Sequence, residues 1–396
     1  MTDQRLRDLL HEQVADLEPS DLSGAAWAGA RRIRQRRVAV VAGSAVAIVA
    51  VVAGSLVLAR GDGGEPTDPA PTPTTEQTVV PSSVVAPGRD YRGAKTWWAP
   101  TSAQEKDLPL LRGTPLPDEI DLAEGAPAHP AGVRAVAVYQ LAGESVAPGR
   151  VVVIGADRTS YSLDVGRLDR VTDEQGNAQS ALTQESLAPD GKHVFFVQDS
   201  SLEVYDLMKG SWSSYDIVPW MGEQALWLNS AEVWTPGELG PPDGVGTTYD
   251  VTGSGIDSSS GGPDVPRVWD TSDEPFGPIR VSRKDGAAQA MFLAEPATGP
   301  TGGPVGGTDA VAARVGTVEG EDVHLLVMPG LDEGRWKGCC PVAGWLDDET
   351  VLLQSRSGTS RILAWRVGTP DLQRVSRLVG WEPGEEVPVG SFADLR

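Results

Sequence analysis

Hydrophobic residues near the start of the chain predict one short amphipathic helix. Apolar side chains recur at helical spacing at Leu6, Leu9, Leu10, Val14 and Leu17. Pro19 ends this pattern, and so short a stripe cannot bury itself in water. We therefore expect residues 1–37 to be a cytoplasmic amphipathic segment that either stays loosely ordered at the membrane surface or packs on a partner protein.

The longest apolar run, residues 38–59, predicts a transmembrane helix. It carries no charge, and a helix of its length spans roughly 33 Å, enough for a hydrocarbon core of about 30 Å. Five arginines precede it, at Arg31, Arg32, Arg34, Arg36 and Arg37. Because basic flanks stay inside, they predict a cytoplasmic N-terminus and an extracytoplasmic C-terminus. The alternative is a cleaved signal peptide, whose apolar core is normally about 7–15 residues and therefore shorter than this run.

A segment without aromatic residues follows the apolar run. Residues 60–89 are rich in Pro, Thr and acidic side chains, and such a composition cannot bury enough surface to fold. We expect a disordered stalk that holds the rest of the chain away from the bilayer.

Residues 90–396 show short apolar or alternating runs separated by Gly, Pro, Asn and Asp, which is typical of β-strands. The clearest runs are residues 133–141, 150–156, 193–198, 202–207, 323–328, 350–355 and 361–367. No long helical pattern interrupts them, so an all-β domain is expected. Strands this short and numerous favour a barrel, a sandwich or a propeller.

A recurring turn selects the propeller. Asp190-Gly191 lies between apolar segments, Asp347-Asp348 occupies the same place in a second unit, and Asp285-Gly286 marks a weaker copy. The first two turns are 157 residues apart, which is three to four repeats at roughly 40–45 residues each. Residues 90–396 therefore predict six blades, with seven as the alternative.

The pattern that begins at Ser186, S-x-x-PDG followed by an apolar run, resembles TolB-type β-propeller repeats. The order of basic N-terminus, single span, Pro/Thr stalk and degenerate blades is similar to that of membrane-anchored WD-like propeller proteins of actinobacteria. The resemblance implies a binding or scaffolding surface and no defined chemistry. One repeat fits well, and the GH…WD pair of strict WD repeats is absent.

Charge and composition exclude several classes of function. The formal net charge of −22 argues against nucleic-acid binding, which needs Lys and Arg to neutralise phosphates. Four His and two Cys leave little material for a metal site, and no cofactor is predicted. The sequence holds no G-x-S-x-G, Walker or H-E-x-x-H motif.

The remaining polar candidates favour structural roles. The histidines of the outer domain, His129, His193 and His324, are scattered, so packing or surface positions are expected for them. The adjacent acidic pairs Asp347-Asp348 and Glu385-Glu386 do not flank a substrate bond as the two carboxylates of a glycosidase do. Residues 257–264 lack the spacing of a calcium loop, and a flexible loop is expected there.

Tryptophan is common, with 12 residues in the chain. Eleven of them lie in the outer domain, where packing between blades is expected and an aromatic surface for sugar or peptide is the alternative.

Cys339 and Cys340 are adjacent and are the only cysteines. On the predicted topology they lie in an oxidising compartment, so we expect a disulfide between them. The alternatives are two buried free thiols and, least favoured, a metal site.

These observations favour a membrane-anchored, non-enzymatic propeller that binds an extracytoplasmic protein, peptide or glycan. The first alternative is a transmembrane regulator whose residues 1–37 bind a cytoplasmic partner such as an alternative sigma factor. That alternative rests on the resemblance, and the zinc-type anti-sigma pattern is absent. The second alternative is an extracytoplasmic hydrolase, which would rest on fold analogy alone.

Overall fold

The computed structural model describes residues 85–395 apart from short gaps. The gaps are residues 142–148, 173–177, 219–223, 238–244, 254–255, 262–267, 270–272, 295–296, 299–303, 306–307, 317–321, 330–337 and 382–387. Contacts divide the chain into residues 1–77 and residues 78–396, and the description that follows concerns the second unit alone. The predicted cytoplasmic segment, transmembrane helix and most of the stalk lie outside the described residues. Within the described part, no helix is both long and apolar enough to cross a bilayer.

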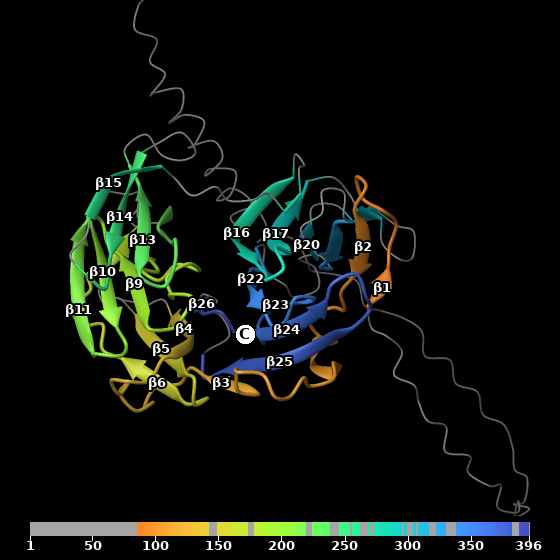
Figure 1. Cartoon of the computed structure of the whole chain (residues 1–396). Coiled ribbons are helices and arrows are strands. Elements are labelled where there is room, and N and C mark those ends of the chain that lie inside the picture. Colours follow the sequence, from red (N-terminus) through yellow and green to blue (C-terminus); the bar gives the residue numbers. More distant parts are fainter. Residues whose placement is uncertain are drawn as a thin grey trace, which may run out of the picture. The chain divides into compact units, whose positions relative to one another are not determined.

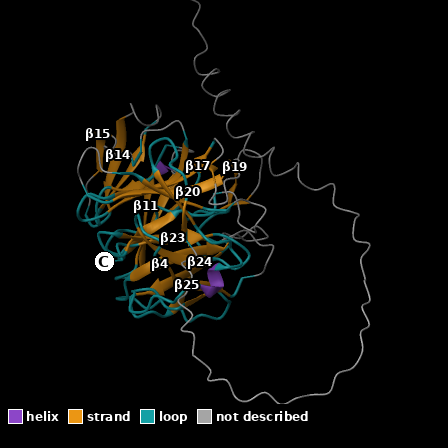
Figure 2. Cartoon of the chain, turned by 90° about the vertical axis from the view of Figure 1, so that its right-hand side faces the viewer, coloured by secondary structure: helices purple, strands orange, loops and turns teal. Residues whose placement is uncertain are grey.

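Five sheets, antiparallel except for one parallel pair in each of two, lie around a common centre and form a five-bladed β-propeller (Figure 1). The described secondary structure is almost entirely strand (Figure 2), with short 3-10 turns that include η1 (Glu105–Asp107). The all-β propeller predicted from the sequence is therefore confirmed.

Each blade is a meander that runs from an inner to an outer strand. Blade 1 contains, from the inside, β26 (Val389–Phe392), β4 (Ala135–Leu141), β5 (Arg150–Gly155) and β6 (Ser160–Leu163). Blade 2 contains β9 (His193–Val197), β10 (Ser201–Asp206) and β11 (Ser211–Asp216). Its inner position is taken by residues 186–188, which hydrogen-bond to β9. Blade 3 contains β12 (Leu226–Trp227), β13 (Glu232–Pro236), β14 (Val245–Asp250) and β15 (Ile256–Gly261).

Blades 4 and 5 are widened by strands from the N-terminal side of the domain. Blade 4 contains β16 (Glu274–Val281), β17 (Ala287–Leu293), β20 (Thr308–Arg314) and β21 (His324–Val327), followed by β2 (Lys95–Trp98) and β1 (Ala86–Pro87). Blade 5 contains β22 (Val342–Trp345), β23 (Thr350–Ser355), β24 (Arg361–Arg366) and β25 (Leu372–Val379), followed by β3 (Glu119–Asp121). Two small hairpins lie within connections: β7 (Val171–Thr172) with β8 (Ala178–Gln179), and β18 (Ala297–Thr298) with β19 (Pro304–Val305).

The expectation of six blades, or seven, is wrong. Residues 85–121 supply added outer strands instead of a blade, because β2 pairs parallel with β21 and β3 pairs parallel with β25. The turns at Asp190 and Asp347 belong to blades 2 and 5, so 157 residues contain three repeats. Each repeat is thus longer than the roughly 40–45 residues of a typical blade, because connections between strands are extended.

The described fold also includes the end of the predicted stalk. Ala86 and Pro87 pair with Trp98 and Trp97, and the Val85 side chain is 1% exposed in a hydrophobic cluster. Apolar residues at this end of the segment therefore join the domain.

The ring is closed by strands from opposite ends of the domain. β26, the last strand, pairs antiparallel with β4, the first blade strand, from Val389 opposite Gln140 to Phe392 opposite Ala137. Without β26, blade 1 has no inner strand.

Apolar side chains fill the spaces between neighbouring blades. Separate clusters pack blade 4 on blade 5, blade 5 on blade 1, blade 1 on blade 2, and blade 2 on blade 3. A fifth cluster covers the other face of blade 4 and includes Trp98 and Val268. Burial of such faces between stacked sheets is the main stabilising term in a propeller.

Candidate functional site

The two ends of the propeller differ in the length of their connections. Because each blade is an antiparallel meander, alternate connections lie at opposite ends. At one end, the short-turn end, neighbouring strands of the same blade are joined by connections of four or five residues, with residues 315–323 as the exception. The other end, the long-loop end, holds residues 164–185, 262–273, 294–307 and 328–341.

Aspartate side chains shape the short-turn end. Asp190 accepts a hydrogen bond from the backbone N–H of Lys192 (3.0 Å), and Asp347 accepts one from Glu349 (2.8 Å). Gly191 takes φ of 71°, and Asp285 takes φ of 61°. All three predicted turns lie at this end, where they join the first two strands of blades 2, 4 and 5, and they are tight structural turns.

Asp347 and Asp348 line a shallow pocket of about 480 Å³ at the short-turn end of blade 5. The Asp348 carboxylate is paired with Lys284 across 3.3 Å, and the Glu349 carboxylate is paired with Arg366 across 2.7 Å. Two carboxylates at this pocket therefore lie in exposed ion pairs with basic side chains.

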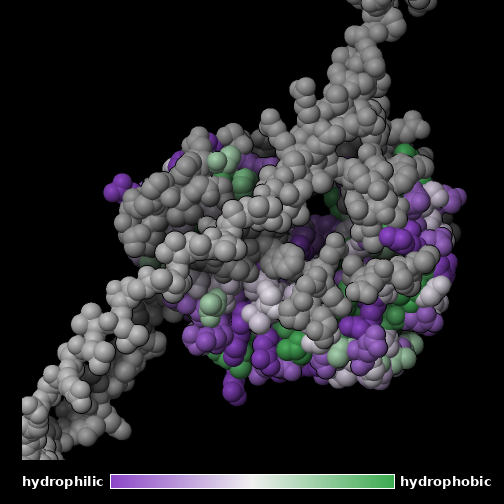
Figure 3. Space-filling model, turned by 180° about the vertical axis from the view of Figure 1, so that it is seen from behind, coloured by the Kyte–Doolittle hydropathy of each residue, from purple (hydrophilic) through white to green (hydrophobic). Residues whose placement is uncertain are grey.

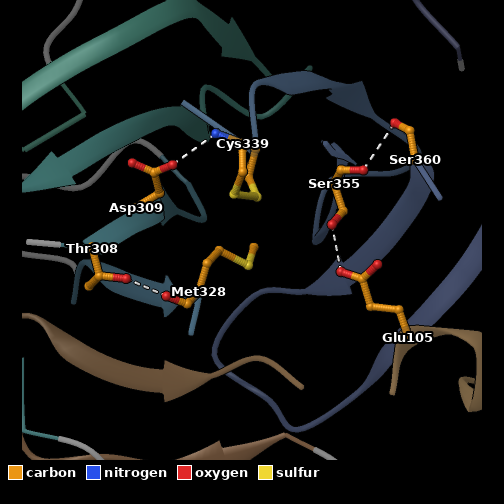
Figure 4. The surroundings of a disulfide bond; sticks show 8 residues. Glu105, Thr308, Asp309, Met328, Cys339, Ser355 and Ser360 are labelled. Carbon is orange, nitrogen blue, oxygen red and sulfur yellow. Dashed lines mark hydrogen bonds between the residues drawn. A yellow bond between two sulfur atoms is a disulfide. The ribbon is translucent and has the colours of Figure 1, made fainter. Parts of the chain in front are cut away.

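The Cys339–Cys340 disulfide lies at the long-loop end, between strands of blades 4 and 5 (Figure 4). Both side chains are at most 1% exposed and belong to the cluster that packs these blades together. The Cys339 backbone N–H donates to Asp309 Oδ2 (2.8 Å), and the Cys339 carbonyl accepts from the Arg356 N–H (2.8 Å). The dipeptide thus connects blade 4 to the β23–β24 turn of blade 5.

A buried ion pair lies beside this region. Arg361 Nη1 donates to Glu105 Oε2 (3.3 Å), and Ser355 Oγ donates to Glu105 Oε1 (2.6 Å; Figure 4 shows this contact). Burial lowers the pKa of Arg361, and the Glu105 carboxylate opposes that shift. The pair attaches η1 to blade 5 and leaves no reactive carboxylate free.

Polar groups also link the inner strands at the centre. Arg280 on β16 contacts the Glu185 carboxylate (3.1 Å) and donates to the Gln184 carbonyl (2.8 Å). Ser391 on β26 accepts from the Leu187 N–H (2.8 Å) and donates to the same carbonyl (2.9 Å). A packing gap too small for a water molecule, lined by Gln184, Arg280 and residues of β22 and β26, lies beside them.

The structure does not bring the three histidines together. His129 and His193 lie in blades 1 and 2, and His324 begins β21 in blade 4. Burial lowers the pKa of each imidazole; for His193, Asp206 at 3.6 Å opposes the shift. No group of three metal-ligating side chains occurs among the described residues.

Tryptophan side chains pack inside and between blades. Trp345 and Trp365 are 2% and 0% exposed in the cluster between blades 4 and 5, and Trp212 and Trp227 pack against clusters of blade 2. On the side seen in Figure 3, hydrophobic residues form small separate patches among hydrophilic ones. These described positions favour packing over an aromatic binding surface.

The sequence did not reveal the buried polar groups at the seam between blades 5 and 1. Arg356, Tyr139 and Gln354 each carry a buried polar atom without a hydrogen-bond partner. Tyr139 lies in the apolar run 133–141 and Gln354 in the run 350–355, where the pattern indicates a strand only.

Comparisons with known proteins show no family for this chain. No family model matches the chain, and no curated protein matches it. Among solved structures, the AtxE2 isopeptidase matches 68% of this chain at 13% identity, with a TM-score of 0.31. That match takes in 48% of the isopeptidase, so the chain spans about half its length.

Two propeller domains are matched over more of their own length. The β-propeller domain of Cps50 (Swd1) from Myceliophteria thermophila is 11% identical, with 65% of this chain and 89% of that chain covered and a TM-score of 0.29. The WD40 repeats of RRP9 are 11% identical, with 64% and 85% covered and a TM-score of 0.30.

Proposed function

We propose that the protein is a membrane-anchored binding module whose propeller lies outside the cytoplasm and binds a protein, peptide or glycan through its long-loop end. The observation that carries the proposal is the difference between the two ends. Tight aspartate turns occupy one end, whereas connections of nine to 22 residues between blades gather at the other. Loops on a rigid scaffold are where binding residues concentrate.

The anchor in this proposal is the uncharged run 38–59, and the five arginines before it fix the orientation. The acidic residues of the outer part keep it soluble and away from anionic lipid. The proposed role is non-enzymatic.

A second candidate role is regulation across the membrane. The helical stripe from Leu6 to Leu17 is too short to fold alone and has the spacing of a partner-binding helix. Capture of a cytoplasmic protein by the full chain, and its loss when Leu9 and Leu10 are both replaced by Glu, would support this role. Capture by both forms alike would argue against it.

Photo-crosslinking in cells tests the proposed function directly. A photoreactive phenylalanine is placed in the full chain at Asp199 or Thr359, exposed residues of the long-loop end, or at Met208 or Asp371, exposed residues of the short-turn end. Asp199 and Met208 both lie in blade 2, and Thr359 and Asp371 both lie in blade 5. Each short-turn position is therefore a matched control for the long-loop position of the same blade. We expect cross-linked partners from the long-loop positions only. Cross-links from the short-turn positions alone would overturn the proposal.

A further inference from the structure

The first residues of the domain lie along the outside of three blades. β2 pairs parallel with β21 of blade 4, and β3 pairs parallel with β25 of blade 5. Residues 127–129 lie beside β6 of blade 1 in the same way. There the Ser162 N–H donates to the Pro127 carbonyl (2.8 Å), and the His129 N–H donates to the Ser162 carbonyl (2.9 Å). The outer edges of blades 4, 5 and 1 therefore each bind an extended segment through main-chain hydrogen bonds.

Blade 2 has no such addition in the part of the chain that the structure describes. Its outermost strand, β11, pairs with β10 alone and in a regular register (Figure 1). The Ile217 N–H donates to the Ser200 carbonyl (3.0 Å), and in an antiparallel ladder every second residue bonds to the partner strand. The backbone N–H groups of Trp212, Ser214 and Asp216 therefore point away from β10, at the open edge of the sheet.

Aromatic side chains hold this edge in place from both faces. Trp212 packs on Tyr205 with 4.9 Å between ring centroids, and Tyr215 packs on Tyr249 with 5.3 Å. The Tyr249 hydroxyl also donates to the Asp216 carbonyl (2.6 Å). The exposed side chains of the strand are Ser211, Ser213, Ser214 and Asp216. A regular, exposed edge that contains neither Lys nor Pro is a template for a further strand.

The charge beside this edge is acidic. Residues 210–266 contain β11 and the strands of blade 3, and they hold eight Asp and Glu but no Lys, Arg or His. Two basic side chains near β11 are already paired, Arg167 with Glu203 (2.8 Å) and Lys209 with Asp206 (2.9 Å). A second copy of the chain would bring the same negative charge to the edge and be repelled, whereas a basic segment would be attracted.

We propose that the outer edge of β11 binds an extended, basic segment of another protein, which adds a strand to blade 2. The N–H groups of Ser214 and Asp216 donate to the main chain of this segment, and its Lys or Arg side chains face the acidic surface. These two groups lie at the end of β11 that leads to the long-loop end, away from Met208. The contact is made by a strand edge and not by the long loops, so it goes beyond the proposed function.

Photo-crosslinking in cells tests the edge, with a photoreactive phenylalanine at Ser213 of the full chain. Ser214→Pro removes one outward N–H group and places a ring at the edge. Ser214→Ala is the matched control, because it removes only the hydroxyl that donates to Glu203 Oε1 (2.5 Å). We expect a cross-linked product in the unaltered chain and in Ser214→Ala, and at least about fivefold less in Ser214→Pro.

Charge reversal provides a second pair of variants that leaves the backbone unchanged. Asp216→Lys places a positive charge at the end of β11, and Asp107→Lys makes the same change at an exposed position of η1 beside blade 5. We expect Asp216→Lys to reduce the Ser213 cross-link at least about twofold and Asp107→Lys to leave it unchanged. This pair decides the question if circular dichroism shows that Ser214→Pro does not fold.

Four results would overturn the proposal. They are no cross-link from Ser213 in the unaltered chain, equal cross-linking in the folded Ser214→Pro or in Asp216→Lys, a product made of two copies of this chain, and a cross-linked segment without Lys or Arg. Thr359 lies in blade 5, so its cross-links report on the long-loop end and not on β11. A failure at the edge is therefore distinguishable from a failure of the proposed function.

Discussion

Cys339 and Cys340 are buried where blades 4 and 5 meet, and their sulfur atoms are bonded to one another. We predict that unreduced protein from its native compartment takes up no alkyl group under denaturing conditions, and that reduction allows two. Intact-mass measurement checks this result. Two alkyl groups added without reductant would show free thiols instead, and a doubled mass that reductant halves would show bridges between chains.

His193 gives a residue-scale prediction for pH. Burial holds its pKa in the folded protein below the ordinary value of 6.5. As the pH falls below about 6.5, the unfolded state takes up the proton on His193 before the folded state does. The free energy of unfolding is therefore highest above that pH, and it decreases as the pH falls through the folded pKa.

We therefore expect His193→Gln to lose less stability than the unaltered chain between pH 7.5 and pH 5. Urea unfolding at a series of pH values measures the difference. His129 and His324 also have lowered pKa values, so part of the pH dependence persists in the variant. An equal or steeper loss in His193→Gln would contradict the assignment.

At the scale of single elements, the Asp190 turn depends on one glycine. Gly191 takes a φ of 71°, and a Cβ atom there would lie 2.0 Å from the Ala135 carbonyl oxygen. We predict that Gly191→Ala destabilises the domain by about 2 kcal/mol or more, because backbone strain and a backbone clash add. Gly358→Ala is the control: no atom lies within 4 Å of its added Cβ, and a change within about 0.5 kcal/mol is expected. Equal effects in denaturant unfolding would argue against the turn.

The strands β1 and β2 predict where the folded domain begins. Val85 and Trp98 are 1% and 5% exposed in clusters of blade 4. Removal of residues 78–98 should lower the free energy of unfolding by several kcal/mol, and with it the thermal midpoint, relative to a chain that starts at Thr78, since these side chains lose their burial. Circular dichroism during thermal unfolding measures the difference, and identical midpoints would show that β1 and β2 contribute nothing.

Local pattern was sufficient to predict the strands and the turns but not their grouping. Residues 193–198 and 350–355 alternate or cluster as strands do, and Asp190-Gly191 carries its own turn chemistry. The parallel additions of β2 and β3 join residues more than 200 positions apart, and no local signal specifies them. For the same reason, the polar seam of Tyr139, Gln354 and Arg356 became visible only when blades 5 and 1 were brought together.

At the scale of the whole molecule, the propeller joins both ends of its domain. β26 completes blade 1, while β1, β2 and β3 widen blades 4 and 5. Blade count was mispredicted because repeat length was taken from compact blades, whereas the long-loop end lengthens each repeat. The outcome is a scaffold with one compact end and one end built from long connections.

The proposed function requires that this propeller stand outside the cytoplasm on a single membrane anchor. A reporter that is active only outside the cytoplasm, fused after Arg396 of the full chain, tests it most directly. We predict an active fusion, and weaker activity when the five arginines before Val38 are replaced by neutral residues. An inactive fusion, together with activity of a cytoplasm-specific reporter at the same position, would contradict the account.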